Sequence, residues 1–379
     1  MSDVTVERVE TVPLEAPLDE PFGYAQEWVE TRAALLVRVE ASDGTVGWGE
    51  CWGPIAGTRE TVDRLLAPEL VGTDPTPVER RSEDLYDLGR RAYQSVVPLP
   101  ALSGVDLALW DLAGKLADVP VSRLLGGARR ESVRAYATGH YFRHDAALET
   151  QYESLAAEAR KNAAALGAVK AKVGLQLLGY GPDEDVELVR RIREAVGDDT
   201  TLMVDANYAY DAGTARRVGR ELEPLDVSWF EEPVPPEDLD GYAALRDALD
   251  VRVAGGECHA PYEFRRLFER GGLDVAQPDV CNVGGLTAAR RVAALAREYG
   301  VPVVPHAWGT PVALAATLHL VSTLPDEPWL EFDRSANPLR EELSPSPPRP
   351  DGDGRVPVPD GPGLGVDLDS AAIERYRID

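Results

Sequence analysis

The first fifty residues alternate between apolar and polar positions, which is the pattern of strands with one buried face. Two such runs in AALLVRVEASDGTVGWGEC (residues 33–51) are joined by Ser42-Asp43-Gly44, a polar turn that predicts a hairpin. From about residue 58 to 125 the pattern becomes helical. Leu107, Trp110, Leu112 and Leu116 fall near one face of the last helix, and Gly126-Gly127 ends the segment.

Beyond residue 130, short β-rich segments alternate with helical segments such as DEDVELVRRIREAVGDD and LTAARRVAALAREYG. The β-rich segments are VRAYAT at 133, AVKAKV at 168, TLMVDAN at 201, VSWFEEP at 227, VRVAGGE at 251, LDVAQPD at 273, VPVVPHA at 301 and PWLEFD at 328. Eight strands with intervening helices predict an α/β fold with a parallel, TIM-like (β/α)7β barrel. A predicted helix at 311–324 fills most of the last connection, so we expect the barrel to close irregularly.

These patterns divide the chain into three parts. We expect an N-terminal α+β domain at residues 1–130, a barrel that carries the catalytic site at 131–343, and a C-terminal segment at 344–379. The last segment is rich in proline and glycine and cannot belong to the barrel. We expect it to return in an ordered path across the first domain; a flexible tail is the alternative.

The charge of the chain excludes two classes of partner. The formal net charge is −26, whereas nucleic acids and anionic membranes both require a positive surface. Acidic residues are spread over the whole chain, and only four of the 39 basic residues are lysines. Because concentrated salt screens self-repulsion, this composition is typical of a protein from a halophile. A cationic substrate is the alternative reading of the charge.

The cysteines and the apolar runs indicate the compartment. Cys51, Cys258 and Cys281 are too widely spaced for a disulfide framework or a zinc site. The opening MSDVTVERVE has no apolar signal core, and no apolar run approaches the length that crosses a bilayer. We therefore expect a cytoplasmic protein.

The later strands end in polar or charged residues, and strand ends at the C-terminal face of such a barrel form its active site. Asp205, Glu231 and Glu257 are spaced 26 residues apart, one βα unit each. Three carboxylates that converge are unfavourable without a cation, and oxygen ligands suit Mg²⁺. Each acid could instead cap a helix or pair with an arginine, but three in register favour a metal site.

Lys170 and Lys172 are half of all the lysines in this chain, and one alanine separates them. Strand alternation places both amines on the same side, in the mouth of the barrel. Arginine stays protonated, whereas a lysine near another cation and a metal can lose its proton and act as a base. A solvated strand edge is the alternative, but Val169 and Val173 make this strand apolar.

His306 ends the segment VPVVPHA, and Asp279 ends the preceding strand, 27 residues earlier. The carboxylate of Asp279 is expected to hold the imidazole and favour its charged form, which makes the pair a general acid or base. A lone histidine is more often structural, but this one would face a lysine base across a metal.

At these residues the chain resembles the enolase superfamily, and within it the mandelate racemase-like group. The resemblance covers essentially the whole chain. Its motifs occur in the order of that family: ALWDLAGK, LLGG, VKAKVG, VDANYAYD, WFEEP, GGE, QPDVCNVGG, PHAWG and WLEFD. The resemblance implies that the N-terminal domain is a capping domain, completed by the C-terminal tail, that sets specificity through loops 17–30 and near 50.

The resemblance also assigns roles to individual residues. It implies that Asp205, Glu231 and Glu257 bind Mg²⁺ and that Lys172 and the His306–Asp279 pair are the two acid/base groups. Lys170 would lower the pKa of Lys172 and contact the substrate carboxylate, and Glu331 would hydrogen-bond the enolate oxygen. Asn207 matches a substrate-side amide. Asp279, where muconate-lactonizing relatives have lysine, favours the racemase-like and acid-sugar dehydratase members.

The predicted function is a Mg²⁺-dependent acid-sugar dehydratase that acts on an aldonate or aldarate, a small carboxylate. Removal of the proton alpha to the carboxylate gives an enediolate, which Mg²⁺ and a hydrogen-bond donor stabilise. Candidate substrate-binding residues are Tyr24, Trp28, His140 and Trp308. The loop that bears Tyr24, Gln26 and Trp28 is more polar than a phenyl-binding pocket needs. Racemisation of a 2-hydroxy acid is the first alternative, and a catalytically silent barrel is the second. The resemblance further implies a homo-oligomer, often an octamer.

Overall fold

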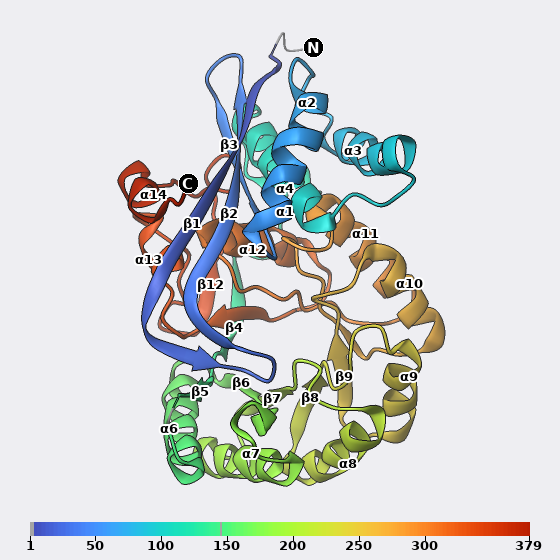
Figure 1. Cartoon of the computed structure of the whole chain (residues 1–379), viewed down its shortest axis with the longest axis vertical. Helices are drawn as coiled ribbons and strands as arrows, with labels where there is room; N and C mark the ends of the chain where they lie inside the picture. Colours follow the sequence, from blue (N-terminus) through green and yellow to red (C-terminus); the bar gives the residue numbers. More distant parts are fainter. Residues whose placement is uncertain (1–3, 145) are drawn as a thin grey trace.

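The computed structural model describes residues 4–144 and 146–379, so the first three residues of the chain lie outside the described residues. An N-terminal sheet and its helices form the upper part of the molecule in Figure 1, and the barrel forms the lower part. The long hairpin of β1 and β2 runs from the upper part to the barrel, where its tip reaches the region of β5, β6 and β7. This hairpin places residues of the N-terminal unit over the strand ends.

The N-terminal unit has strands first and helices afterwards, as the polar pattern predicts. Its antiparallel sheet has the order β3-β2-β1-β5, with β1 (Val6–Gly23), β2 (Trp28–Ala41), β3 (Val46–Cys51) and β5 (Phe142–Arg143). The predicted hairpin is confirmed, because β2 and β3 pair antiparallel around residues 42–45. The helical elements are α1 (Ile55–Thr61), the π-helical η1 (Val62–Leu66), α2 (Ala67–Leu70), α3 (Val78–Tyr93), α4 (Leu99–Leu116) and α5 (Val121–Leu124).

Helix α4 is buried on all sides rather than on one face, which the sequence pattern did not predict. Every residue from 101 to 114 is buried. The reason is the close approach of β3, whose alternate glycines face the helix. A Cβ on Gly47 would lie 2.2 Å from the carbonyl oxygen of Ala108, and one on Gly49 would lie 1.9 Å from that of Gly104. Glycine at both positions therefore lets strand and helix backbones touch.

The barrel is built from parallel strands in the order β10-β9-β8-β7-β6-β4-β11. These strands are β4 (Ser132–Thr138), β6 (Ala168–Lys172), β7 (Thr201–Asp205), β8 (Val227–Glu231), β9 (Arg252–Gly255), β10 (Val275–Ala276) and β11 (Leu330–Asp333). The connecting helices are α6 (Leu148–Leu166), η2 (Leu175–Leu178), α7 (Pro182–Val196), α8 (Ala212–Leu222), η3 (Glu223–Leu225), α9 (Leu239–Ala248), α10 (Pro261–Arg270), α11 (Gly285–Glu298) and α12 (Pro311–Thr323). The predicted barrel-like α/β fold with an N-terminal α+β domain is confirmed.

The segment VPVVPHA, predicted as a strand, forms only an isolated bridge between Ala276 and Val303. Pro302 and Pro305 have no backbone N–H, so the segment cannot form a continuous ladder. The backbone still continues the curvature of the sheet, because Val304 donates to the carbonyl of Ala276 and Ala276 donates to that of Pro302. The expected irregular closure of the barrel falls in this segment.

The C-terminal segment takes an ordered path back across the N-terminal unit. It follows α13 (Pro338–Glu342) and contains β12 (Arg355–Pro357), which pairs antiparallel with the start of β4, and α14 (Ser370–Tyr376). Isolated bridges join Gly363 to Pro120 and Arg377 to Leu14. The buried ring of His319 accepts from the backbone N–H of Ser122 through Nδ1 and donates through Nε2 to the carbonyl of Leu364. One histidine thus connects the barrel, the N-terminal unit and the tail.

All three cysteines are free: Cys51 and Cys281 are buried and Cys258 is exposed. This agrees with the prediction that they form no disulfide framework. Across residues 4–144 and 146–379, no helix has both the length and the apolar character needed to traverse a bilayer.

Candidate active site

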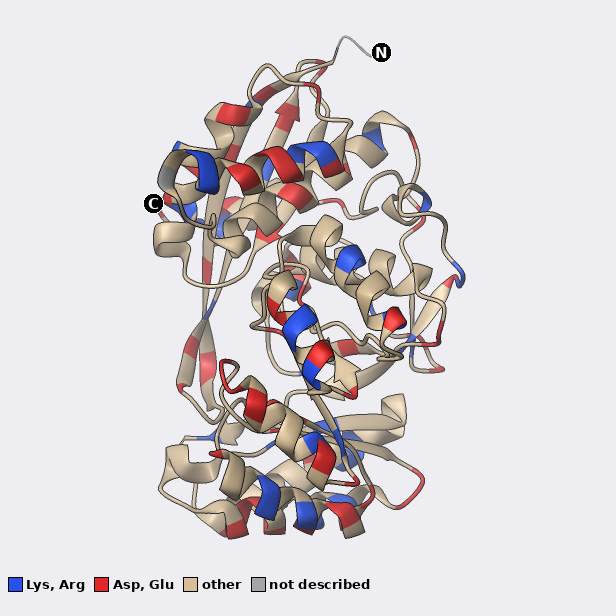
Figure 2. Cartoon of the chain, turned by 90° about the vertical axis from the view of Figure 1, so that its right-hand side faces the viewer, with Lys and Arg blue, Asp and Glu red and all other residues tan. Residues whose placement is uncertain are grey.

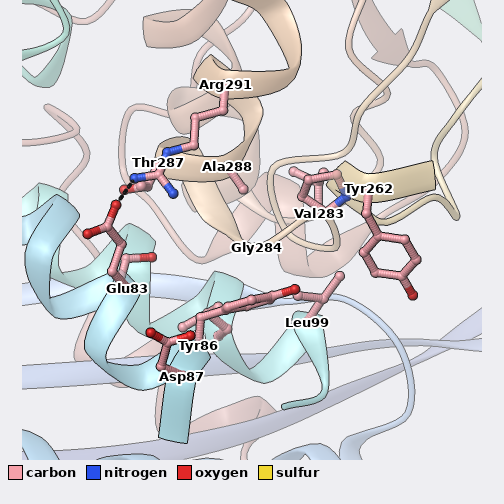
Figure 3. Close-up of a pocket in the computed structure, with 13 residues that line it drawn as sticks. Glu83, Tyr86, Asp87, Leu99, Tyr262, Val283, Gly284, Thr287, Ala288 and Arg291 are labelled. Carbon is pink, nitrogen blue, oxygen red and sulfur yellow. Dashed lines mark hydrogen bonds and ion pairs between the residues drawn. The ribbon is translucent and has the colours of Figure 1, made fainter. Parts of the chain in front are cut away.

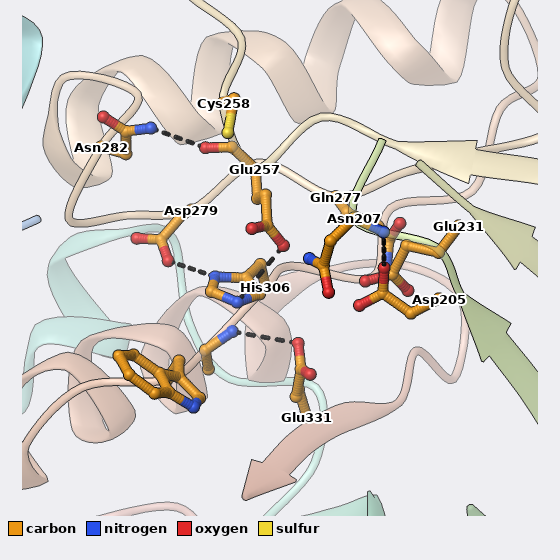
Figure 4. A network of polar contacts seen from close by, with 12 residues as sticks. Asp205, Asn207, Glu231, Glu257, Cys258, Gln277, Asp279, Asn282, His306 and Glu331 are labelled. Atoms are coloured by element: carbon orange, nitrogen blue, oxygen red, sulfur yellow. Dashed lines mark hydrogen bonds and ion pairs between the residues drawn. The ribbon is translucent and has the colours of Figure 1, made fainter. Parts of the chain in front are cut away.

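Three of the predicted groups lie side by side because their strands end in register. Lys172, Asp205 and Glu231 are the last residues of β6, β7 and β8, and each is aligned with the next across the parallel ladder. Glu257 follows the end of β9 by two residues, and Glu331 lies on β11. Figure 4 shows Glu257, Asp279 and Glu331 around His306, with Asp205 and Glu231 beside each other farther along the same site.

The two lysines point to the same side of β6, as strand alternation predicts. The Nζ atom of Lys170 lies 2.5 Å from Oε1 of Glu231 and 2.7 Å from Oε1 of Glu331. The Nζ atom of Lys172 lies 2.5 Å from Oδ2 of Asp205 and 2.9 Å from Oδ1 of Asn207. Lys170 is fully buried and Lys172 is nearly so, hence both ammonium groups depend on these carboxylates for their charge.

The pKa of Lys172 is raised, which differs from the expected lowering. Burial is the largest single influence and acts to lower this pKa, as does the charge of Lys170, but Asp205 and the further acidic groups around the amine together outweigh them. Conversely, burial acts to raise the pKa of Asp205, but Lys172 and Lys170 outweigh it and lower that pKa to about 2. A neutral Lys172 therefore requires another cation to neutralise Asp205.

Glu231 is the most strongly anchored acid of the predicted metal set. Its Oε2 accepts from the indole N–H of Trp229 at 2.9 Å and from the amide of Gln277 at 2.6 Å, while its Oε1 contacts Lys170. Burial raises its pKa to about 7 against the lowering by Lys170. The donors hold the carboxylate in one orientation at the end of β8.

Glu232, the residue after this predicted ligand, was not chosen from the sequence. It is 1% exposed, and neither of its carboxylate oxygens has a hydrogen-bond partner. Burial raises its pKa well above the ordinary value, with a further rise from the charge of Glu257. Unpartnered buried acids are costly, and a divalent cation among them would remove that cost.

The donor set therefore has the chemistry that Mg²⁺ requires, although the three predicted ligands are not gathered in this structure. Among the described residues, the side chains whose possible metal-ligand atoms lie within 4.8 Å of one another are those of Glu232, Glu257 and Cys258. Asp205 is instead occupied by Lys172, and Glu257 faces His306. Both partners are cations, so a metal would compete for the same carboxylate oxygens.

The predicted His306–Asp279 pair is formed. The Nδ1–H of His306 donates to Oδ2 of Asp279 at 2.6 Å, and its Nε2 lies 3.3 Å from Oε2 of Glu257 (Figure 4). The second oxygen of Asp279 accepts from the backbone N–H of Cys281, which fixes the carboxylate. Burial acts to lower the pKa of His306, but Glu257, Glu331 and Asp279 outweigh it and raise the pKa to about 10. The imidazole is accordingly charged at neutral pH and can donate a proton.

Glu331 connects the lysine side of the site to the histidine side. Its Oε1 contacts Lys170, and its Oε2 accepts from the backbone N–H of Ala307, next to the histidine. Burial acts to raise its pKa, but Lys170 and His306 outweigh it, so the pKa is lowered. Glu331 is therefore an acceptor in this structure and not the hydrogen-bond donor that the enolate would need.

Lys172 and His306 line one cavity of about 490 Å³, which the N-terminal unit covers. Its far wall comes from the β1–β2 hairpin and from residues 50–54, and the amide of Gln26 donates to the carbonyl of Asn207 to hold the hairpin in place. Two separately predicted specificity loops thus meet over the predicted acid/base groups.

Of the predicted substrate-binding residues, Tyr24, Asn207 and Trp308 line this cavity. Trp28 does not line it; its ring packs edge-on against His144, because its neighbour Glu27 takes the inward position. His140 is also outside the lining. Its ring is fully buried, with Nδ1 at 2.8 Å from the carbonyl oxygen of Lys170 and Nε2 at 3.2 Å from the amide of Asn162.

Several lining residues were not chosen from the sequence. Trp52 packs edge-on against both His306 and Trp308, and the hydroxyl of Tyr141 accepts from the indole N–H of Trp308 at 2.8 Å. Glu27 and Tyr208 also line the cavity. Trp52 belongs to the predicted loop near residue 50 and Tyr141 follows the predicted His140, so an aromatic residue beside a predicted site residue was the available signal.

A second cavity, of about 280 Å³, lies between α3, α4, α10 and α11. Figure 3 shows Tyr86, Tyr262 and Leu99 on its walls and an ion pair between Arg291 and Glu83. None of its lining residues lies at a strand end of the barrel. It has no part in the chemistry of the lysine and histidine groups.

Comparison with protein families agrees with this architecture. Residues 6–126 match the family described as mandelate racemase / muconate lactonizing enzyme, N-terminal domain. Residues 154–372 match the family described as enolase C-terminal domain-like.

Two curated relatives cover most of the chain. One is a D-galactarolactone cycloisomerase from Agrobacterium fabrum, which is 40% identical over 98% of this chain and 98% of its own. The other is an arabinonate dehydratase from Saccharolobus solfataricus, which is 34% identical over 90% of both chains.

Two solved structures have the same fold. The 3,6-anhydro-D-galactonate cycloisomerase from Zobellia galactanivorans has a TM-score of 0.88 and 38% identity, over 99% of this chain and 100% of that one. A racemase from Streptomyces coelicolor with bound magnesium has a TM-score of 0.87 and 32% identity, over 98% of this chain and 100% of that one.

Proposed function

The chain belongs to the mandelate racemase / muconate lactonizing enzyme family of the enolase superfamily, and from this premise we propose that it catalyses β-elimination on an acid sugar. The reaction begins with removal of the proton alpha to a carboxylate and ends with loss of the oxygen substituent on the next carbon. One observation carries the proposal: Lys172 and His306 line the same carboxylate-rich cavity, and His306 is hydrogen-bonded to Asp279 behind it.

In this proposal Lys172 takes the alpha proton, and His306, charged through Asp279, protonates the departing oxygen. Asp205, Glu231 and Glu257 would hold Mg²⁺, whose Lewis acidity supplies stabilisation for the negative charge that develops on the substrate carboxylate. Lys170 contributes a fixed positive charge beside Glu231 and Glu331. The far wall of the cavity, formed by the β1–β2 hairpin and residues 50–54, excludes water from the reacting carbons.

The leaving group defines two candidate reactions. If the oxygen belongs to a ring, as in a lactone or an anhydro sugar, the ring opens and the product is an isomer of the substrate. If the oxygen is a free hydroxyl, water leaves and a 2-keto-3-deoxy acid forms. Two of the compared proteins are cycloisomerases, and they share 40% and 38% of their residues with this chain, which favours ring opening. The dehydratase relative supports the second reaction.

We expect the mass of the product to distinguish these reactions. The enzyme with Mg²⁺ is incubated in ²H₂O with anhydro-aldonates, aldarolactones, aldonates and aldarates, and products are followed by mass spectrometry and a 2-keto acid assay. Ring opening yields a keto acid with no loss of water, whereas dehydration yields one lighter by one water. Deuterium at the alpha carbon of recovered substrate without keto acid would favour racemisation. Absence of both keto acid and deuterium incorporation with every substrate would contradict the proposal.

We also propose that the acid-rich surface adapts the protein to concentrated salt. Asp and Glu are spread over both the N-terminal unit and the barrel in Figure 2 rather than confined to one patch. The Debye length falls from about 10 Å at 0.1 M to about 3 Å at 1 M salt, so repulsion within a chain of net charge −26 should weaken. We expect the thermal unfolding midpoint to rise steadily with KCl over this range. An unchanged unfolding midpoint would contradict salt adaptation. The homo-oligomer that the family resemblance implies stays a prediction.

A further inference from the structure

The two walls of the catalytic cavity differ in charge. The barrel wall contributes Lys172 and His306, which are the basic residues among all described residues that line the cavity. The hairpin wall contributes Tyr24, Glu27 and Thr31, so the side of the cavity away from the barrel offers hydroxyls and a carboxylate. An anionic group on the substrate therefore has cationic partners at one end of the cavity only.

The hairpin does carry an arginine, but this residue faces away from the cavity. Strand alternation places Thr31 and Ala33 in the lining and Arg32 behind them. The guanidinium of Arg32 is 2% exposed, lies 3.0 Å from Oδ2 of Asp333, and stacks over the ring of Trp308 at 4.3 Å. The charge of Arg32 is thus paired with Asp333, and this ion pair holds the hairpin against the barrel.

Glu27 lies at the tip of the hairpin, where its position is fixed from two sides. The hydroxyl of Tyr24 donates to Oε1 of Glu27 at 3.2 Å. The adjacent Gln26 donates to the carbonyl of Asn207 at 2.6 Å, which ties the tip to the loop that follows β7. The carboxylate of Glu27 is therefore held at the solvent-exposed edge of the cavity, on the hairpin wall.

From this arrangement we infer that the substrate carries a single carboxylate, bound at the barrel wall, and that its far end is uncharged. The inference rests on the proposed function and names its substrate class: an aldonate, an anhydro-aldonate or an aldarolactone, rather than an open-chain aldarate. A second carboxylate would approach Glu27 with no cation to pair with, and like charges without a counter-charge disfavour binding. Uncharged hydroxyls or a ring oxygen can instead bond with Tyr24 and Thr31.

The experiment compares D-galactonate with galactarate, which share their carbon configuration and differ only in the terminal hydroxymethyl or carboxylate group. Binding to the Mg²⁺-loaded enzyme is measured by calorimetry, and turnover is measured separately. We expect galactonate to bind about fivefold more tightly at 0.1 M KCl, since one unpaired contact between like charges near 4 Å weakens binding by about this factor. The preference should decrease near 1 M KCl, where screening is stronger.

Glu27→Gln should reduce the preference for galactonate over galactarate by about fivefold. Glu27→Lys should reduce this preference further, because the lysine supplies a counter-charge for the second carboxylate. Glu30→Gln is the matched control, because Glu30 is an exposed acid of the same hairpin that does not line the cavity. Equal binding of the two acids to the unmodified enzyme, or equal effects of Glu27→Gln and Glu30→Gln, would overturn this inference. Binding with the expected preference but no turnover of any acid sugar would contradict the proposed function alone. Failure of both acids to bind would overturn this inference, and the substrate panel would then decide the proposed function separately.

Discussion

Lys172→Ala should reduce removal of the alpha proton by at least about a thousandfold, because general bases contribute rate factors of this order. Lys172 is the basic group of β6 that lines the cavity, whereas Lys170 is buried against Glu231 and Glu331. The measurement is the exchange of the alpha hydrogen for solvent deuterium, followed by NMR on a substrate that the enzyme turns over. Thermal unfolding in the presence of Mg²⁺ checks that the variant is folded.

Lys172→Arg is the decisive companion variant. Arginine keeps the positive charge beside Asp205 but stays protonated in proteins, so exchange should remain lost while the fold is preserved. Lys161→Ala serves as the control, because Lys161 is an exposed lysine of α6 remote from the strand ends, and it should leave exchange unchanged. If either substitution at Lys172 retained normal exchange, the assignment of the base would be wrong.

Asp205→Asn should abolish both the effect of Mg²⁺ on stability and most of the activity. A ligand that binds only the folded state raises its stability by about 2.7 kcal/mol at a concentration one hundred times its Kd. We therefore expect Mg²⁺ to raise the unfolding midpoint of the unmodified protein and to leave that of the variant nearly unchanged. Activity should fall by at least about a hundredfold, as happens when stabilisation of developing negative charge is removed.

The control for this prediction is Asp183→Asn, since Asp183 is an acid of α7 whose side chain is 84% exposed. It should retain the full response to Mg²⁺. Chelation of the metal from the unmodified enzyme should reproduce the loss of activity and be reversed by added Mg²⁺. A full Mg²⁺ response in Asp205→Asn, measured as the midpoint shift, would show that this carboxylate does not bind the cation.

Many of the catalytic residues on the barrel side of the cavity were predictable, because their positions depend on local sequence. A strand ends where its apolar alternation ends, and each of the later strands carries one polar residue at that point, so Lys172, Asp205 and Glu231 could be placed before any contact was known. The same reasoning paired His306 with Asp279, although the prolines beside His306 prevent the regular strand that was predicted there.

The hairpin side of the cavity was predicted less well, because the sequence of the hairpin does not indicate which of its two faces packs against the barrel. Trp28 was predicted to bind substrate and Glu27 was not, yet Glu27 lines the cavity and Trp28 packs against His144. His140 was chosen for its type, but its backbone has a positive φ of 53° and its ring turns beneath β6. A one-residue change of register exchanges the two faces of a strand, so such assignments depend on packing.

The order of chemical groups around the barrel was determined by the sequence alone, since each group lies at a fixed position on its own strand and parallel strands align their ends. The tertiary structure decided which groups touch and which charge prevails. Lys172 has a raised pKa because it lies against Asp205, Glu232 is buried without a hydrogen-bond partner, and Arg32 forms an ion pair with Asp333. These outcomes depend on distances between residues far apart in the chain, which are set by the pairing of the barrel strands and by the packing of the hairpin against the barrel.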